Sequence, residues 1–123
     1  MKIRRKARFV GDAITKWLKG EARKVELTKE FSFIDENGFK WVAPKGSIVD
    51  GSSIPRAFWR VIGSPFVGLH RRASIIHDVY CVTKSEPYEK VHRMYYDAIR
   101  CDGLSKFKAK LMYRAIKIGG PKW

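Results

Sequence analysis

The chain has 123 residues, of which 26 are Lys or Arg and 12 are Asp or Glu, so its formal net charge at pH 7 is +14. This length suits a single domain, and a hydrophobic content of 45% is enough for a buried core, which excludes wholesale disorder. No apolar run approaches the roughly 18 residues of a membrane-spanning helix, and the basic N-terminus lacks the apolar stretch of a signal peptide, so we expect neither a membrane-spanning nor a Sec-secreted protein.

The N-terminal half predicts short strands and turns. The first candidate element, at 11–20, is ambiguous, because its apolar residues have helical spacing but the segment is short and has a glycine at each end. Residues 24–28 and 31–34 alternate polar and apolar side chains, which is the period of a half-buried strand. An Asn-Gly pair then supplies a tight hairpin turn, after which residues 39–42 alternate again. Residues 47–49 are expected to form one more short strand.

The C-terminal half predicts helices. Pro55 suits the first turn of a short helix over residues 55–62, because proline lacks an N–H that this turn would leave unpaired. Longer helices are expected over about 69–82, over about 87–102 and over about 104–118. Together these elements predict one α+β domain, in which a small antiparallel sheet is followed by a helical hairpin and a C-terminal helix. The last helix carries apolar side chains at helical spacing: Leu104, Phe107, Leu111, Ala115 and Ile118.

The positive charge is concentrated at the two ends of the chain. Residues 1–24 carry nine basic and two acidic side chains, and residues 100–123 carry seven and one, whereas the middle has a net charge of only +1. If the ends meet in space, they form one basic face that suits a polyanion, namely nucleic acid, an acidic protein or an anionic membrane surface. The alternative is that the charge only keeps a small protein soluble.

The feature most indicative of chemistry is His77-Asp78 within an apolar helical stretch. A buried imidazole or carboxylate needs a partner, and the short connection near residues 84–87 makes the next helix antiparallel. We therefore predict that His77 and Asp97 lie within hydrogen-bonding distance across the two helices. A carboxylate that holds a histidine fixes its tautomer and raises its basicity, as a general base that activates water requires. The other histidines, His70 and His92, lie beside basic residues and are expected at the surface.

The loop at residues 49–56 is the second candidate for a site. It joins the predicted sheet to the first helix through an acidic residue, a glycine and two hydroxyls, so it can present Asp50 and backbone amides to the helices. Together with the His-Asp motif and Asp97, Asp50 would complete an oxygen-and-nitrogen site for a divalent cation. The structural alternative is that Asp50 only caps a turn and that His77 and Asp97 form a buried pair without a catalytic role.

A hydrolase hypothesis assigns a role to each of these side chains. His77 is the base, Asp97 orients it, and an arginine stabilises developing negative charge. A triad of Ser52, His77 and Asp97 is a weaker variant, since the loop lacks a G-x-S-x-G turn. The catalytic set is His77, Asp97 and Asp78; the substrate-binding set is Asp50, Ser52, Arg56 and Arg93; the candidate metal pair is Asp50 and Asp78.

Six segments form a recognisable ordered series: Val49–Arg56, Gly63–Phe66, Ala73–Tyr80, Arg93–Asp97, Leu111–Ile116 and a closing Gly-x-x-x-Trp at 119–123. The series resembles the phage-associated domain-of-unknown-function family 1353 over residues 22–123, which leaves 1–21 as a basic N-terminal extension. Val49 stands where the family usually has Thr, and Ser52 where it usually has Ala. The resemblance implies a bacteriophage or prophage protein and implies no particular activity.

Secreted phospholipases resemble this chain more loosely. They carry a His-Asp-x-x-Tyr motif on one of two antiparallel helices, and an Asp of the other helix bonds to the His. Here Tyr80 comes one residue early, and the chain has only two cysteines and no glycine-rich calcium loop. This resemblance implies the mechanism of a His-Asp dyad but not a lipid substrate.

Two hypotheses about function follow. The first is a small phage hydrolase that acts on an ester, amide or phosphodiester at the His/Asp site, with a divalent cation as its one candidate cofactor. The second is a non-enzymatic basic phage protein, either a virion component or a host-takeover factor, that binds nucleic acid, an acidic partner or other virion proteins. In the second hypothesis the His-Asp cluster only holds the helices together. Either protein would act in the host cytoplasm or in the phage virion.

Overall fold

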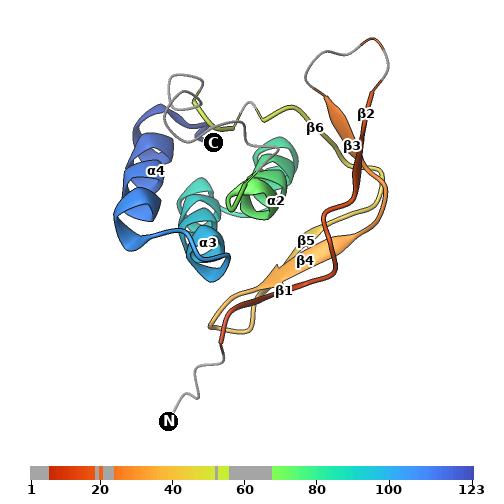
Figure 1. The fold of residues 1–123 in the computed structure, drawn as a ribbon. Coiled ribbons are helices and arrows are strands. Elements are labelled where there is room, and N and C mark those ends of the chain that lie inside the picture. The colour runs from red at the N-terminus through yellow and green to blue at the C-terminus, as the bar shows by residue number, and fades with distance from the viewer. Residues whose placement is uncertain (1–5, 19, 21–23, 52, 56–67) are drawn as a thin grey trace.

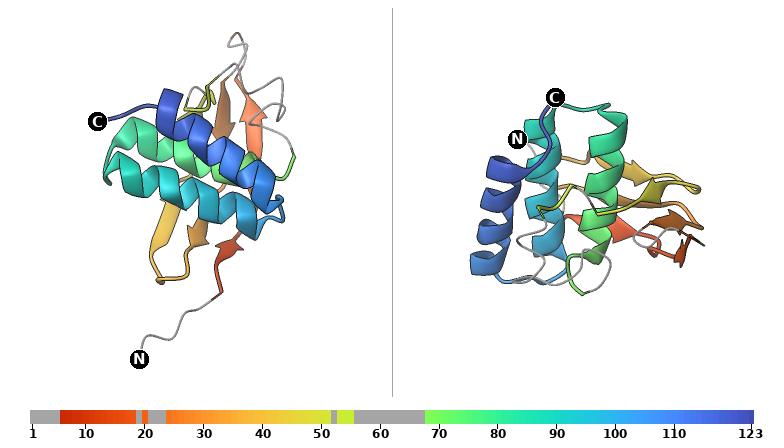
Figure 2. Two further views of the ribbon diagram at one scale, coloured as in Figure 1. Left: turned by 90° about the vertical axis from the view of Figure 1, so that its left-hand side faces the viewer. Right: turned by 90° about the horizontal axis from the view of Figure 1, so that it is seen from above.

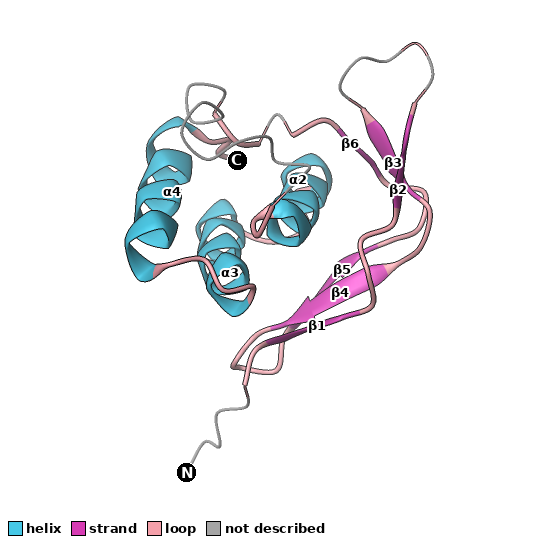
Figure 3. Cartoon of the chain, viewed as in Figure 1, coloured by secondary structure: helices cyan, strands magenta, loops and turns pink. Residues whose placement is uncertain are grey.

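The computed structural model describes residues 6–18, 20, 24–51, 53–55 and 68–123, and its elements are labelled as in Figure 1. The strands of the described part are β1 (Arg8–Val10), β2 (Thr15–Trp17), β3 (Val25–Leu27), β4 (Phe31–Ile34), β5 (Lys40–Ala43) and β6 (Ile48–Val49). The helices are α2 (Arg71–Thr83), α3 (Tyr88–Cys101) and α4 (Lys106–Gly119). Strands occupy one side of the molecule and helices the other (Figure 3), so the predicted α+β class is confirmed.

The strands form two antiparallel sheets of three strands each, in the orders β1-β4-β5 and β2-β3-β6. The β4–β5 hairpin is the one that the alternating pattern and the Asn-Gly pair predict. Asp35 closes its turn, because Oδ1 of this residue accepts hydrogen bonds from the N–H groups of Asn37 at 2.9 Å and Phe39 at 3.0 Å. Gly38 has a φ of +82°, which glycine adopts without steric strain.

The N-terminal segment supplies an edge strand to each sheet. β1 pairs with β4, and β2 pairs with β3. The helical spacing within residues 11–20 does not produce a helix, because Gly11 turns the chain at a φ of +86° and the following backbone pairs with a neighbouring strand. Residues of both sheets therefore come from the segment 1–21, which the sequence resemblance leaves outside the domain.

The three described helices lie side by side, with α2 nearest the strands and α4 farthest from them (Figure 2). They agree with the predicted helices to within a few residues at each end. α2 contacts α3 on one side and β5 and β6 on the other, so every side chain from Ala73 to Val79 is buried. α3 lies between α2 and α4.

α4 does not bury the face that holds its largest apolar side chains. Phe107 and Ile118, which the sequence spacing singles out, are 78% and 81% exposed, and Leu111 is 37% exposed. Two of the four buried side chains of α4 are alanines, which occupy little space at the contact with α3. The buried side chains of α4 are Ala109, Met112, Ala115 and Ile116.

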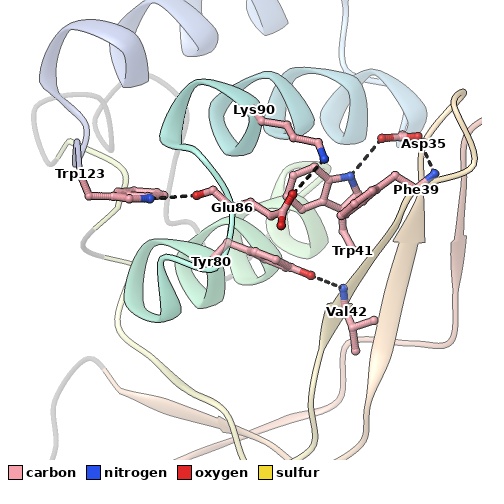
Figure 4. A network of polar contacts seen from close by, with 8 residues as sticks. All are labelled: Asp35, Phe39, Trp41, Val42, Tyr80, Glu86, Lys90 and Trp123. Carbon is pink, nitrogen blue, oxygen red and sulfur yellow. Dashed lines mark hydrogen bonds and ion pairs between the residues drawn. The ribbon is translucent and has the colours of Figure 1, made fainter.

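Polar contacts join the β4–β5 hairpin to the helices (Figure 4). The Tyr80 hydroxyl on α2 accepts a hydrogen bond from the N–H of Val42 at 3.0 Å. The ammonium of Lys90 on α3 lies 3.7 Å from the ring centroid of Phe39, a favourable cation–π position, and also pairs with Glu86 at 2.9 Å. The hairpin is therefore fixed to both helices of the α2–α3 pair.

The first strand is also fixed to the helices, through Arg72. Its guanidinium lies 4.0 Å from the ring centroid of Phe9 in β1 and forms a two-point ion pair with Asp102. The thiol of Cys101 donates to the carbonyl of Ala7 at 3.3 Å. β1 is thus held by the C-terminal end of α3 as well as by β4.

Some predictions lie outside the described residues, namely most of the short helix expected over 55–62 and the site residues Ser52 and Arg56. None of the described helices is both long and apolar enough to cross a membrane.

Candidate functional site

His77 lies at the centre of the contact between α2 and α3. Its side chain is 0% exposed, and its Nε2 lies 2.8 Å from Nδ1 of His92. The ring of Tyr95 meets the imidazole edge-on at a centroid distance of 5.1 Å. Cys81, one turn further along α2, places Sγ 3.7 Å from Nδ1 of His77. Both ring nitrogens therefore face a polar neighbour within the core rather than solvent.

The hydrogen-bond partners determine which ring nitrogen of each histidine carries the proton. Nε2 of His92 lies 2.9 Å from the carbonyl oxygen of Pro121, which only accepts, so His92 carries its proton on Nε2. Nδ1 of a neutral His92 then accepts from the Nε2–H of His77. The sulfur of Cys81 lies 3.7 Å from Nδ1 and 3.9 Å from Nε2 of His77, so it contacts the ring at similar distances from both nitrogens. We call this series of contacts the histidine chain: Cys81, His77, His92 and Pro121.

Burial keeps the histidine chain uncharged. Loss of hydration, and to a lesser extent the neighbouring His92, lowers the pKa of His77 to about 3. Burial likewise lowers the pKa of His92, although the Pro121 carbonyl opposes this effect. Burial, with the charge of Asp78 adding to it, raises the pKa of the Cys81 thiol to about 12. A histidine in this state is a weak base without an exposed lone pair, which is unsuited to general base catalysis.

The predicted pair of His77 and Asp97 is not formed. Among the described residues, no hydrogen bond joins these two side chains, and Oδ1 of Asp97 instead lies 3.4 Å from Nε of Arg93, one turn earlier on α3. Burial raises the pKa of Asp97, and the Arg93 cation opposes the rise. The prediction of this pair is therefore wrong, although Asp97 and Arg93 do lie together.

The register of the α2–α3 hairpin explains the difference. The connection between α2 and α3 covers residues 84–87, as the sequence indicates, and the chain begins to turn at Lys84, which follows α2 in the left-handed conformation with a φ of 54°. In the resulting register, Ser74 faces Tyr95 with the two hydroxyls 3.1 Å apart, and His77 faces His92. Asp97 lies more than one turn beyond the position opposite His77.

Asp97 and Arg93 line a separate open pocket of about 390 Å³ beside α3. Its walls carry charges of both signs, so it has no uniform electrostatic preference for an anion or a cation. Its described lining is Lys6, Ala7, Glu36, Arg93, Tyr96, Asp97, Arg100 and Cys101.

Asp78 anchors the loop that follows β6. The carboxylate is buried, with Oδ2 accepting from the N–H of Asp50 and Oδ1 from the N–H of Ser53, both at 3.2 Å. Burial raises the pKa of Asp78, while these two amide donors oppose the rise. Because backbone donors occupy both of its oxygens, Asp78 acts as a structural clamp on the loop.

Of the residues of the predicted cation site, the structure brings Asp50 and Asp78 together, and the bond between them runs from the backbone N–H of Asp50 to the Asp78 carboxylate. The buried side chain of Ser53 lies beside the same carboxylate. Within the described part of the chain, no group of three or more His, Cys, Asp or Glu side chains could hold a metal ion. The two hydrogen bonds from the backbone amides of Asp50 and Ser53 are therefore enough to explain the buried position of the Asp78 carboxylate.

Sequence reasoning misses His92 as a member of the site. His70 and His92 are both buried, so the expectation that they lie at the surface is wrong. A usable signal is the spacing of His92, which is one turn from Tyr88 and from Tyr95 on the apolar side of α3. The contribution of Pro121 has no sequence signal, because it comes from a backbone carbonyl.

A second candidate site is an interface on α4. Helical periodicity places two adjacent rows of side chains on its outward side. An open hollow of about 400 Å³ on this helix is lined by Phe107, Lys110, Leu111, Tyr113 and Arg114. One row is apolar and the other is basic. We call the two rows together the outer α4 face: Phe107, Leu111 and Ile118 in the apolar row, and Lys110, Arg114 and Lys117 in the basic row.

Comparisons with known proteins place these features in a family. Residues 25–116, which include the Asp78 clamp and most of the histidine chain, match the family model described as "Protein of unknown function (DUF1353)". Two relatives in Sinorhizobium fredii (strain NBRC 101917 / NGR234) are the uncharacterized proteins y4jT, 49% identical over 98 residues, and y4iH, 38% identical over 104 residues.

These relatives are longer than the chain. The matched segments cover 80% and 85% of this chain but only 29% and 44% of y4jT and y4iH. No solved structure matches the chain. The family match over most of the sequence confirms the resemblance seen in its motifs, and the chain belongs to the DUF1353 family.

Proposed function

We propose that this chain is a non-enzymatic basic domain that binds an anionic partner through the outer α4 face. The observation that carries the proposal is the charge of this helix, which has five Lys or Arg side chains and no Asp or Glu. No ion pair joins α4 to another described residue. Such cations along about 20 Å of helix attract phosphate or carboxylate groups.

Three cations of the neighbouring helices, Arg72, Lys90 and Arg93, differ from those of α4 because each has an acidic partner. Arg72 on α2 pairs with Asp102, and Arg93 on α3 pairs with Asp97. A cation with an acidic neighbour contributes little field at a distance, whereas the charges on α4 add to one another. This contrast favours α4 as the binding surface.

A hydrolase built on His77 has weaker support. A catalytic base needs a lone pair that a substrate or water can reach, whereas the side chain of His77 is fully buried and its Nε2 is bonded to His92. The proposal therefore gives His77 and Asp78 the task of holding α2, α3 and the loop after β6 in place.

The biological setting is also a proposal. The motif resemblance to a phage-associated family favours a phage or prophage protein, working as a virion component or a host-takeover factor in the virion or the host cytoplasm. Nucleic acid, an acidic protein, a virion protein and an anionic membrane surface all fit the charge of α4.

The test is the salt dependence of binding to defined polyanions. Duplex DNA, polyglutamate and vesicles that contain phosphatidylglycerol are titrated with the protein at several salt concentrations. We expect salt-dependent binding to at least one of them, with a shallower salt dependence in a variant that carries Lys110→Gln, Arg114→Gln and Lys117→Gln, because fewer counterions are released.

A matched control removes the same charge elsewhere. Lys40 in β5, Lys29 between β3 and β4, and Lys45 between β5 and β6 are exposed, and their replacement by Gln is expected to change binding much less. The proposal is overturned if none of the three polyanions binds, or if the control variant loses as much affinity as the α4 variant.

A further inference from the structure

The apolar row of the outer α4 face is not explained by binding to charge. Phe107 and Ile118 are 78% and 81% exposed, which is unusual for large apolar side chains that share a face. With Leu111 they lie at i, i+4 and i+11, so they form one row about 16 Å long. α4 packs against α3 with a different face, which is buried, so this packing does not explain the apolar row.

The basic side chains flank this row. Helical geometry places Lys110, Arg114 and Lys117 along one side of it and Lys108 along the other. Long basic side chains in this position can lay their methylene groups along an apolar surface while their charges reach outward. An apolar row with a cationic border is the arrangement of helices that lie in the interface of an anionic membrane.

The shape of the surface favours a membrane over a protein. The row is a ridge of exposed side chains on α4, which is the described helix farthest from the strands (Figure 2). A stable protein interface buries about 800 Å² on each partner and needs complementary shape, which a single row of three large side chains does not provide. A lipid surface deforms around such a ridge and needs no matching groove.

We propose that α4 docks on an anionic membrane surface, with Phe107, Leu111 and Ile118 inserted at the boundary between headgroups and acyl chains. This inference rests on the proposed function and names its partner. The flanking cations contact lipid phosphates. Duplex DNA explains the basic row equally well but leaves the apolar row exposed to water, since phosphate contacts need no aliphatic side chains.

The experiment is co-sedimentation with vesicles of phosphatidylcholine, with and without phosphatidylglycerol. We expect the wild-type protein to sediment only with the anionic vesicles. A variant with Phe107→Ser and Ile118→Ser keeps every charge, and we expect its partition coefficient to fall roughly tenfold or more, because two large apolar side chains no longer insert. The side chains are exposed, so the variant is expected to keep its circular dichroism spectrum and melting temperature.

The matched control replaces Val82 and Ile48, which are 69% and 52% exposed outside α4, by Ser. This variant is expected to bind vesicles like the wild type. If the Phe107/Ile118 variant binds the vesicles as tightly as the wild type while the α4 charge variant does not, lipid insertion is overturned and anion binding stands. Binding to DNA or polyglutamate but not to vesicles likewise overturns lipid insertion, while anion binding stands. Absence of salt-dependent binding to every polyanion overturns both proposals.

Discussion

The imidazoles of His77 and His92 share a hydrogen bond of 2.8 Å between Nε2 and Nδ1, across the contact of α2 and α3. This bond joins two helices that are also linked by the buried hydroxyls of Ser74 and Tyr95, and it passes on to the C-terminal segment through the Pro121 carbonyl. A buried bond between two neutral rings has a fixed geometry and a fixed tautomer at each ring. The stability of the helical layer therefore depends on the identity of both side chains.

Replacement of His77 by Ala is expected to lower the free energy of unfolding by about 3 kcal/mol. The change opens a cavity and leaves Nδ1 of His92 without its donor. Urea denaturation of wild type and variant measures the loss, with Thr83→Ala as an exposed control on the same helix. A variant as stable as the wild type would contradict the structural role of the histidine chain.

Stability is expected to fall as the pH is lowered from 7 to 5. The folded state holds the pKa of His77 at about 3, well below its ordinary value of 6.5, so the unfolded chain binds more protons in this range. The stabilisation from neutral His77 is therefore complete above pH 6.5 and decreases below it, by about 2 kcal/mol at pH 5. Asp78 has a raised pKa and offsets part of this loss, because its folded form takes up a proton more readily.

Denaturation curves at the two pH values test the size of the change. The carbon-bound imidazole protons of His77 give a direct check by NMR, since their chemical shift is expected to stay constant from pH 7 to pH 5 in the folded protein. A shift that titrates near the ordinary histidine pKa would show that the ring is solvated and would contradict the buried network.

Replacement of Asp78 by Asn is expected to loosen the loop after β6. The carboxylate accepts from the N–H groups of Asp50 and Ser53, whereas an amide has one acceptor oxygen and turns an NH₂ group toward the other donor. We expect a loss of about 2 kcal/mol in the free energy of unfolding and faster hydrogen exchange at one of these two amides. Asp12→Asn, at an exposed position, serves as the control. Unchanged exchange at both amides would contradict the clamp.

Two substitutions of Trp123 are expected to lower the free energy of unfolding by different amounts. The indole Nε1 of Trp123 donates to the carbonyl of Glu86 at 2.9 Å, and its ring contacts those of Tyr88 and His92 (Figure 4 shows the hydrogen bond). Trp123→Phe removes the donor and is expected to cost about 1 kcal/mol, whereas Trp123→Ala also removes the ring contacts and is expected to cost about 2 kcal/mol. Equal stability of the Ala variant and the wild type in urea would contradict this packing.

Local patterns predict the elements of this fold well. Alternation identifies the β4–β5 hairpin, and helical spacing identifies α2, α3 and α4 to within a few residues. These patterns depend only on residues that are close together in the sequence, so they can be recognised without the structure. The N-terminal strands are harder to predict, because the pairing of β2 depends on β3, and Ile14 and Trp17 have spacing that fits a helix equally well.

The candidate site depends on relationships that local patterns do not contain. Whether His77 faces His92 or Asp97 depends on where the connection turns, and the turn begins at Lys84, the one described residue other than glycine that has a positive φ. In the same way, α4 has apolar side chains on two faces, and only contact with α3 decides which face is buried. The pattern therefore identifies Phe107 as apolar without showing that it is exposed.

The direction of the histidine chain has a consequence for how the family varies. His77 donates to His92, and His92 donates to the carbonyl of Pro121, so a residue at position 77 must donate toward position 92, and a residue at position 92 must donate toward that carbonyl. A substitution that reverses one donor leaves two acceptors or two donors face to face in the core. Positions 77, 81 and 92 are therefore expected to covary among DUF1353 sequences as a block, with an apolar residue at one of them accompanied by apolar residues at the others.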